Sequence, residues 1–307
     1  MLKSTGTLLC LALSLPLLAY ADLRASDLPA ETEWYMHADF EQLKDSDAGQ
    51  PLYAWLEDEV IVEVNEEFEI DLGDAVKRFT AFSNDGSGVI AIVEGNIDQG
   101  LKDKILAAAF AQSGGKFDQR SYGDAIYYKA GNDNGSTRLN AEDSIRHSGY
   151  FTFSVDGRIL AASDEDQIRA LIDSKGRLPG AGNHNGAIIV LSADKQFVQA
   201  GMRTSEFADD DDDWDSNILR NTEQAAVLVS EQNGLIAMDM TLIGADPEMT
   251  SSLGSIVNGL IALQAFSSDI DPEVADLLRN TRVEVEGSTL KVSTVLEPTN
   301  VVRLLGD

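Results

Sequence analysis

Six carboxylates fall within seven consecutive positions in the second half of the chain, and their chemistry suits a cation. The run is Asp209-Asp210-Asp211-Asp212-Asp213-Trp214-Asp215. Consecutive like charges repel unless a cation neutralises them, and carboxylate oxygens are hard ligands that suit Ca²⁺. Asp209, Asp211 and Asp213 are the candidate ligands, although Trp214 stands where an EF-hand loop requires glycine. The alternatives are a solvated acidic loop and a docking surface for a basic partner, with Trp214 as the aromatic anchor.

Two other patterns bear on catalysis, and neither is complete. Ser192-Ala193-Asp194-Lys195 has the serine-to-lysine spacing of penicillin-recognising enzymes, but no Ser-Asp-Asn or Lys-Thr-Gly element accompanies it. The three histidines, His37, His147 and His184, lack metal-ligand spacing; each is expected at the surface or in a turn, with partial burial considered for His37. The sequence therefore predicts no catalytic residues and no cofactor other than Ca²⁺. A hydrolase with an unrecognised active site remains an alternative.

Charge restricts the classes of partner. The chain has 23 basic and 52 acidic residues, which gives a formal net charge of −29. Such a surface repels phosphate backbones and anionic lipid, so it argues against nucleic acid and against direct adsorption to a membrane. Cations and basic proteins are favoured instead, while a purely solubilising role for the charge stays open. The 43% share of hydrophobic residues is that of an ordinary globular protein.

The first 21 residues have the pattern of a secretory signal. Lys3 supplies the positive start, an apolar stretch runs from Leu8 to Leu18, and Ala19-Tyr20-Ala21 is a small-x-small cleavage site. The apolar stretch is too short to span a bilayer, and no later stretch is long enough. We therefore expect cleavage near Ala21 and a periplasmic or secreted mature protein without a membrane span. The signal also contains the single cysteine, Cys10, so the mature chain has no disulfide.

The elements predicted after the signal occur in the same order twice, which indicates an internal duplication. Each copy opens with a strand that ends in Ala-Asp and continues with a helix, a hairpin, a helix, a second hairpin and a short helix. The predicted strands and longer helices are 34–39, 79–82, 89–93, 99–112, 151–155, 159–162 and 167–172 in the first copy, and 188–194, 226–229, 235–238, 247–266, 282–285, 289–295 and 300–305 in the second. Extra strand material at 116–129 belongs to the first copy only.

This order predicts an α+β fold. Two related modules of antiparallel sheet, each with helices packed on one face, are expected at 22–175 and 187–307. Between them, residues 176–186 are rich in glycine and have no apolar period, so they are predicted to be a linker. The linker either separates two domains or crosses between two halves of one sheet.

The start of the mature chain resembles a group of exported bacterial proteins of unknown function. The resemblance rests on Leu28-Pro29-Ala30-Glu31-Thr32, followed by a strand that ends in His37-Ala38-Asp39. It implies export and repeated α+β modules, and it supplies no functional residues. The leading expectation is thus an exported, non-catalytic binding or interaction protein, and the alternatives are a Ca²⁺-binding module, a hydrolase and a structural protein of the cell envelope.

Overall fold

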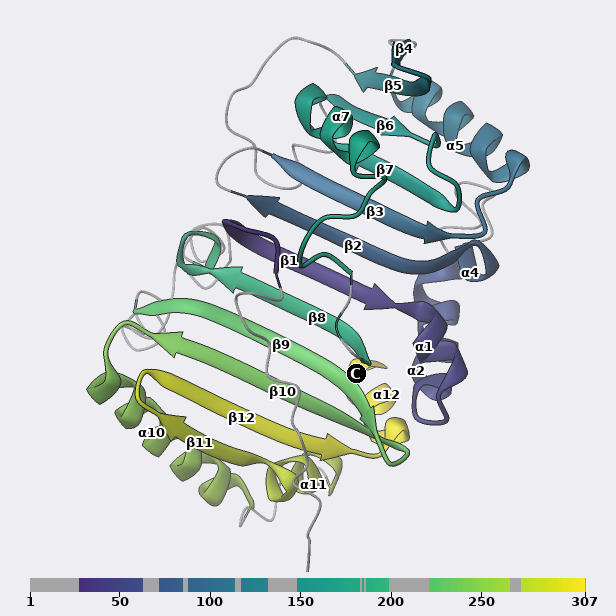
Figure 1. Cartoon of the computed structure of the whole chain (residues 1–307). Helices are drawn as coiled ribbons and strands as arrows, with labels where there is room; N and C mark the ends of the chain where they lie inside the picture. Colours follow the sequence, from purple (N-terminus) through teal and green to yellow (C-terminus); the bar gives the residue numbers. More distant parts are fainter. Residues whose placement is uncertain are drawn as a thin grey trace, which may run out of the picture.

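One antiparallel sheet of 12 strands runs through the whole molecule (Figure 1). The computed structural model describes residues 28–62, 72–84, 88–113, 117–131, 148–182, 184, 186–198, 221–265 and 272–306. The strands are β1 Thr32–Asp39, β2 Val76–Asn84, β3 Val89–Gly95, β4 Phe117–Tyr122, β5 Ala125–Gly131, β6 Ser148–Thr152, β7 Arg158–Ala162, β8 Ala187–Asp194, β9 Thr222–Gln232, β10 Leu235–Gly244, β11 Arg282–Glu286 and β12 Thr289–Leu296. The α+β class is confirmed.

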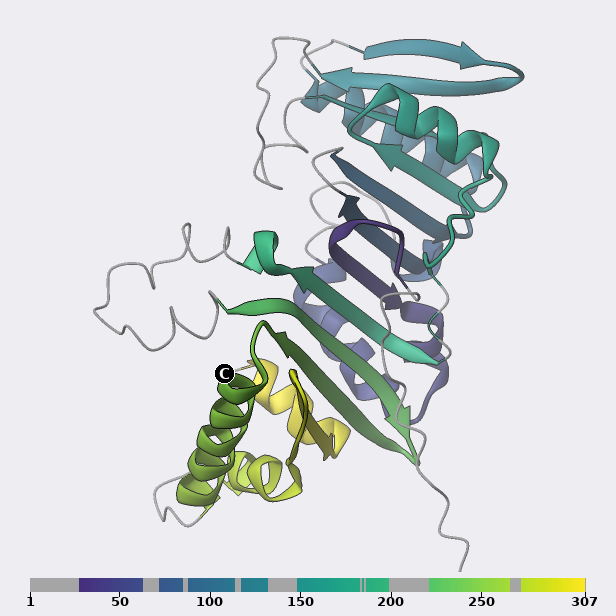
Figure 2. The same ribbon diagram turned by 60° about the vertical axis from the view of Figure 1, so that its left-hand side comes forward.

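Helices cover both faces of this sheet. They are α1 Phe40–Asp45, α2 Gly49–Leu56 with a π-helical extension η2 Glu57–Ile61, α4 Leu72–Ala75, α5 Gln99–Gln112, α7 Glu165–Asp173, α10 Pro247–Ala265, α11 Pro272–Asn280 and α12 Pro298–Gly306. In Figure 1, α7 lies in front of the sheet and α10 and α11 lie behind it, and Figure 2 shows them on opposite sides. Helix α7 thus lies on the opposite face of the sheet from α1 and α2. Within the described residues, none of these helices has the length and apolar character needed to cross a bilayer.

Aspartate side chains start several of the helices, which gives part of the acidic charge a local structural role. Asp39 accepts a hydrogen bond from the Gln42 backbone N–H at 2.8 Å at the start of α1. Asp194, at the end of β8, accepts one from Phe197 N–H at 2.9 Å. Helices α5, α7 and α10 begin with the same arrangement, at Asp98, Asp164 and Asp246. Each such cap stabilises its helix by about 1 kcal/mol, because it satisfies an N–H group that the helix leaves unpaired.

The strand order is the same on both sides of the sheet's centre. Outward from β1 the order is β1-β2-β3-β7-β6, and outward from β8 it is β8-β9-β10-β12-β11, with the β5-β4 pair added to the first side. Strands β1 and β8 pair with each other, and Met36 lies opposite Leu191. Each of these two residues stands two positions before its Ala-Asp pair. This is the arrangement that a duplication would leave, although the duplication itself stays a prediction.

Two apolar clusters form the core, one on each face. We call the face that carries Tyr35 and α7 the front face, which is toward the viewer in Figure 1, and the opposite face the back face. The front cluster contains Tyr35, Phe82 and Leu160 from the sheet, with Ile168 and Leu171 from α7. The back cluster joins β8, β9, β10 and β12 to α1, α2 and α12, through residues Leu43, Leu52, Ile188, Val229, Ile236, Leu296 and Val301. The two faces are thus buried mainly over different halves of the sheet.

The predicted linker is packed against the sheet. It joins α7 to β8 and crosses the front face, as the teal trace in Figure 1 shows. Leu178 and Ala181 pack against the front cluster. At Gly180, which has a φ of +80°, an added Cβ would lie 2.3 Å from the Leu28 backbone, so the chain approaches too closely there for any other residue. Because β1 and β8 pair directly, the two predicted modules are adjoining halves of one sheet, and the boundary between them stays a prediction.

Candidate functional site

The predicted ligand residues lie outside the part of the chain that the structure describes. Asp209, Asp211, Asp213 and Trp214 all belong to residues 199–220, for which no structural account is given. The Ca²⁺ site and the aromatic anchor therefore stay predictions. Among the described residues, no group of three or more histidine, cysteine, aspartate or glutamate side chains is arranged to hold a metal ion.

The serine and lysine of the Ser-x-x-Lys pattern have separate partners. Ser192 is buried on β8, and its hydroxyl accepts a hydrogen bond from the Gln224 side chain at 3.0 Å. The Lys195 ammonium lies 2.6 Å from a Glu223 carboxylate oxygen. The two side chains therefore contact different residues of β9, Gln224 and Glu223. The pattern therefore marks the end of a strand and the start of a helical turn.

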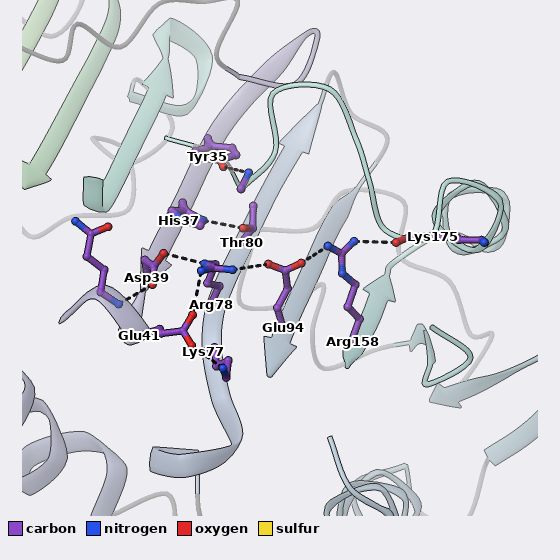
Figure 3. Close-up of polar contacts among 12 residues, drawn as sticks. Tyr35, His37, Asp39, Glu41, Lys77, Arg78, Thr80, Glu94, Arg158 and Lys175 are labelled. Carbon is purple, nitrogen blue, oxygen red and sulfur yellow. Dashed lines mark hydrogen bonds and ion pairs between the residues drawn. The ribbon is translucent and has the colours of Figure 1, made fainter. Parts of the chain in front are cut away.

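Two histidines and a tyrosine, His37, His184 and Tyr35, meet on the front face beside the β1–β8 pairing, and Figure 3 shows Tyr35 and His37 on β1. Tyr35 and His37 point the same way because they are two residues apart on β1. The Tyr35 hydroxyl lies 2.5 Å from Nε2 of His184, and it accepts a hydrogen bond from the Gly182 backbone N–H at 2.9 Å. His37 Nδ1 lies 2.8 Å from the Thr80 hydroxyl on β2, and the His37 and His184 ring centroids are 5.0 Å apart.

Burial controls the charge state of this cluster. His37 is 2% exposed and His184 is 8% exposed, so neither lies at the surface. The burial considered for His37 is nearly complete, and the His184 carbonyl accepts a hydrogen bond from Ala187 N–H three residues on, as in a turn. Burial disfavours the charged imidazole, and the neighbouring His184 adds to the effect; together they lower the pKa of His37 to about 4. Burial also raises the pKa of Tyr35 to about 12, so its phenol stays protonated. At pH 7 the Tyr35 phenol and the His37 imidazole are therefore uncharged hydrogen-bonding groups.

Below this cluster, charged side chains of alternating sign line four neighbouring strands. Asp39, Arg78, Glu94 and Arg158 lie on β1, β2, β3 and β7, and each is opposite the next. The Arg78 Nε atom lies 2.8 Å from an Asp39 carboxylate oxygen, and Arg158 contacts Glu94. Arg158 also donates to the Lys175 carbonyl at 2.8 Å, next to the start of the connection to β8. Figure 3 shows this row, which we call the charge ladder.

The charge ladder has a structural role: every charge in it faces an opposite charge, so the ladder stabilises the sheet.

Replacing Arg78 with methionine leaves Asp39, Glu41 and Glu94 facing one another without the cation they share. Arg78 is 38% exposed, so solvent screens the loss. We expect a destabilisation of roughly 1 kcal/mol at low salt that shrinks near 1 M NaCl.

Urea unfolding at both salt concentrations measures the effect of Arg78→Met. The matched control is Lys195→Met, which removes a single exposed ion pair and should cost less. A loss of stability for Arg78→Met that is the same at low and high salt would show that packing of the side-chain stem, and not the ladder, is responsible.

The back face carries apolar side chains that remain exposed to solvent. Met36 on β1 is opposite Leu191 on β8, Leu191 is opposite Val227 on β9, and Val227 is opposite Met240 on β10. The exposed fractions are 39% for Met36, 40% for Leu191 and 49% for Met240. We call these three residues the back-face apolar row.

Two further groups of exposed apolar side chains lie on the elements around this row. Phe197, which is 41% exposed, follows β8, and its ring centroid lies 6.0 Å from that of Trp34 on β1. Helix α10 exposes Ile256, Leu260 and Leu263, which share one side of the helix because they are three and four residues apart. After Glu248, α10 contains no charged residue. In a chain of net charge −29, a surface without charges is notable.

The sequence contained a clear pattern for the shared face of Tyr35 and His37 and a weaker one for the back-face apolar row. The alternation Tyr35-x-His37-x-Asp39 places three polar side chains on one strand face, and a glycine-rich segment permits close approach of a backbone. The proximity of His184 to His37 could not be derived, because it depends on the path of residues 176–186. Met36 and Leu191 lie within predicted strands, but their exposure could not be predicted, because local alternation does not say which face of a strand a helix covers.

Comparisons with known proteins support the architecture and nothing finer. No protein-family model matches the chain, and no curated protein matches it. Among solved structures, the chain is similar to "Structure of crystal form III of TP0453", with a TM-score of 0.50 and 6% identity over 93% of this chain and 99% of that chain. Two further crystal forms of that protein give TM-scores of 0.45 and 0.47 over 93% and 92% of this chain, also at 6% identity. At this identity, the likeness shows the fold alone.

Proposed function

We propose that the protein is an exported, non-catalytic binding protein that captures a protein partner on its back face. The observation that supports this is the back-face apolar row. Single exposed apolar residues are common on protein surfaces, but contiguous ones mark interaction sites. Met36, Leu191 and Met240 lie on β1, β8 and β10 in one cross-strand row that is completed by Val227 on β9, and each of the three keeps about two fifths or more of its surface exposed.

The acidic surface suggests the character of the partner. A chain with 52 acidic and 23 basic residues repels anionic surfaces and attracts basic ones. A partner with an apolar strip flanked by lysine or arginine therefore fits both features. Long-range charge speeds the encounter, and burial of the apolar row supplies the affinity.

Site-specific photo-crosslinking in the cells that produce the protein tests the proposal. A photoreactive amino acid at position 240 is expected to give a discrete crosslinked product with a protein of the cell envelope. The control position is 126, because Ile126 on β5 is 43% exposed and thus comparable to Met240. N-terminal sequencing of the crosslinked species should give a chain that begins near Asp22, which reports export and cleavage.

The crosslink must also depend on the row itself. The Leu191→Gln variant should lose the product at position 240 while it keeps its unfolding midpoint, because Leu191 is 40% exposed. Equal products at positions 126 and 240, or a product at 240 that survives Leu191→Gln, would contradict the proposal.

A further inference from the structure

Polar contacts hold the described part of the connection between α7 and β8 to the sheet. At its start, Arg158 donates to the Lys175 carbonyl at 2.8 Å. Further along, Gly182 N–H and His184 Nε2 both contact the Tyr35 hydroxyl, at 2.9 Å and 2.5 Å. Near its end, the Gln42 side chain donates to the Gly186 carbonyl at 2.5 Å. The Tyr35 hydroxyl is thus the central anchor of the connection.

The burial of that anchor opposes a positive charge on His184. The Tyr35 hydroxyl accepts from Gly182 N–H and shares a 2.5 Å hydrogen bond with His184 Nε2, in which the donor depends on the tautomer of the histidine. His184 is 8% exposed, so a second proton would place a positive charge in a buried site. Burying that charge costs free energy, which weakens the anchor.

His37 also disfavours a positive charge in this group of side chains. His37 lies beneath His184, with ring centroids 5.0 Å apart, so a charge on either ring opposes a charge on the other. The other groups that face His37 are Tyr35 and Asp39 on its own strand and Arg78 and Thr80 on β2. The Asp39 carboxylate is bound to Arg78, so its negative charge is largely offset. On the other side, β8 presents Val190, which is fully buried and apolar.

We propose that Tyr35, His37 and His184 form an acid-sensitive latch: neutral histidines hold residues 176–182 and His184 of the connection on the front face, and their protonation releases them while the sheet stays folded. Release uncovers the part of the front cluster that Leu178 and Ala181 cover. It also frees the segment that links the two halves beside the β1–β8 pairing. The latch is independent of the back-face row, since the two lie on opposite faces.

The size of the effect follows from linkage. Burial lowers the pKa of His37 from 6.5 to about 4 in the closed form, and an opened connection lets water reach the ring and restores the ordinary value. Between about pH 8 and pH 5, the opening equilibrium should then increase about thirtyfold through His37 alone. Aspartate and glutamate side chains of ordinary pKa stay mostly ionised in this range, so imidazoles dominate the change.

Hydrogen–deuterium exchange of the full mature chain measures the opening. After correction for the intrinsic exchange rate, peptides that contain Gly182 and Ala187 should lose protection about thirtyfold between pH 8 and pH 5. Peptides from β3 and β7 should keep theirs. Equal loss of protection in β3 and β7 would mean that the whole molecule opens, and it would overturn the latch.

Histidine variants separate the latch from other acid effects. The chain has three histidines, so the double variant His37→Gln and His184→Gln leaves His147 alone. In this double variant the protection of residues 176–187 should be independent of pH over the same range, while the matched control His147→Gln should behave like the unaltered chain. Acid-induced loss of protection that persists in the double variant would overturn the proposal.

A third variant keeps the test decisive if the double variant folds poorly. Tyr35→Phe removes the hydroxyl and keeps the ring that stacks on Phe82 at a centroid distance of 6.2 Å. Its connection should already exchange faster at pH 8, because Gly182 N–H and His184 lose their common partner. Unchanged protection of Gly182 in Tyr35→Phe would show that the hydroxyl does not hold the connection.

Discussion

Acidification from pH 7 to pH 4 is expected to lower the free energy of unfolding by about 3 kcal/mol through His37 alone. His37 is 2% exposed, and its pKa falls from 6.5 to about 4 in the folded protein. The unfolded chain therefore binds more protons than the folded protein between these two values. The contribution of His37 is fully present above pH 6.5, and it is lost progressively as the pH falls toward 4.

Urea unfolding at a series of pH values, for the unaltered chain and for His37→Gln, isolates this contribution. The many carboxylates titrate in both proteins, so they cancel in the difference between the two curves. We expect that difference to change by about 3 kcal/mol between pH 7 and pH 4. Parallel curves would mean that the folded protein accommodates a charged His37, and they would remove the electrostatic basis of the latch.

Replacement of Leu160 with alanine is expected to destabilise the protein by about 2–5 kcal/mol. Leu160 is fully buried at the centre of the front cluster, beneath Ile168 and Leu171 of α7. Its Cδ2 atom also lies 2.7 Å from the position that a Cβ would take at Gly176, at the start of the connection to β8. The shortened side chain leaves a cavity that α7, the sheet and the connection all border.

The same substitution at an exposed leucine is the matched control for Leu160→Ala. Leu263 on α10 is 73% exposed, so Leu263→Ala should change the free energy of unfolding by no more than about 0.5 kcal/mol. Urea unfolding of both variants gives the comparison. A similar small loss for both would show that the front cluster is loosely packed, contrary to its burial.

Local signals in the sequence were sufficient for most elements. Alternating apolar residues and turn residues predicted the hairpins, and the Asn233-Gly234 turn has the two positive φ values, 54° and 81°, that a tight hairpin needs. Helix α5 is found over Gln99–Gln112, as predicted, and α10 is found over Pro247–Ala265, while the last residue predicted for it, 266, lies outside the described residues. These features depend on residues within a few positions of one another, which is why a single sequence contains them.

Features that depend on contacts between residues far apart in the chain could not be predicted from local sequence patterns. The sequence left open whether 176–186 separates two domains or crosses one sheet, because the pairing of β1 with β8 joins residues that are far apart in the chain. The position of α7 on the front face was not predicted either, because helical periodicity does not report which face of a sheet a helix covers. The burial of His184 depends on the β1–β8 pairing and on the path of the connection from α7. The candidate site at Asp209 to Trp214 stays a prediction.

The place of β1 in the middle of the sheet also affects how the protein folds. The strand is made early, yet one of its edges stays open until β8 follows, since Met36 pairs with Leu191. A contact of such long sequence separation forms late, because the intervening loop must close first. Until then the free edge of β1 is a template for pairing with other chains. A nascent chain that stops before β8 is thus prone to aggregate, and its completion depends on the arrival of the second half.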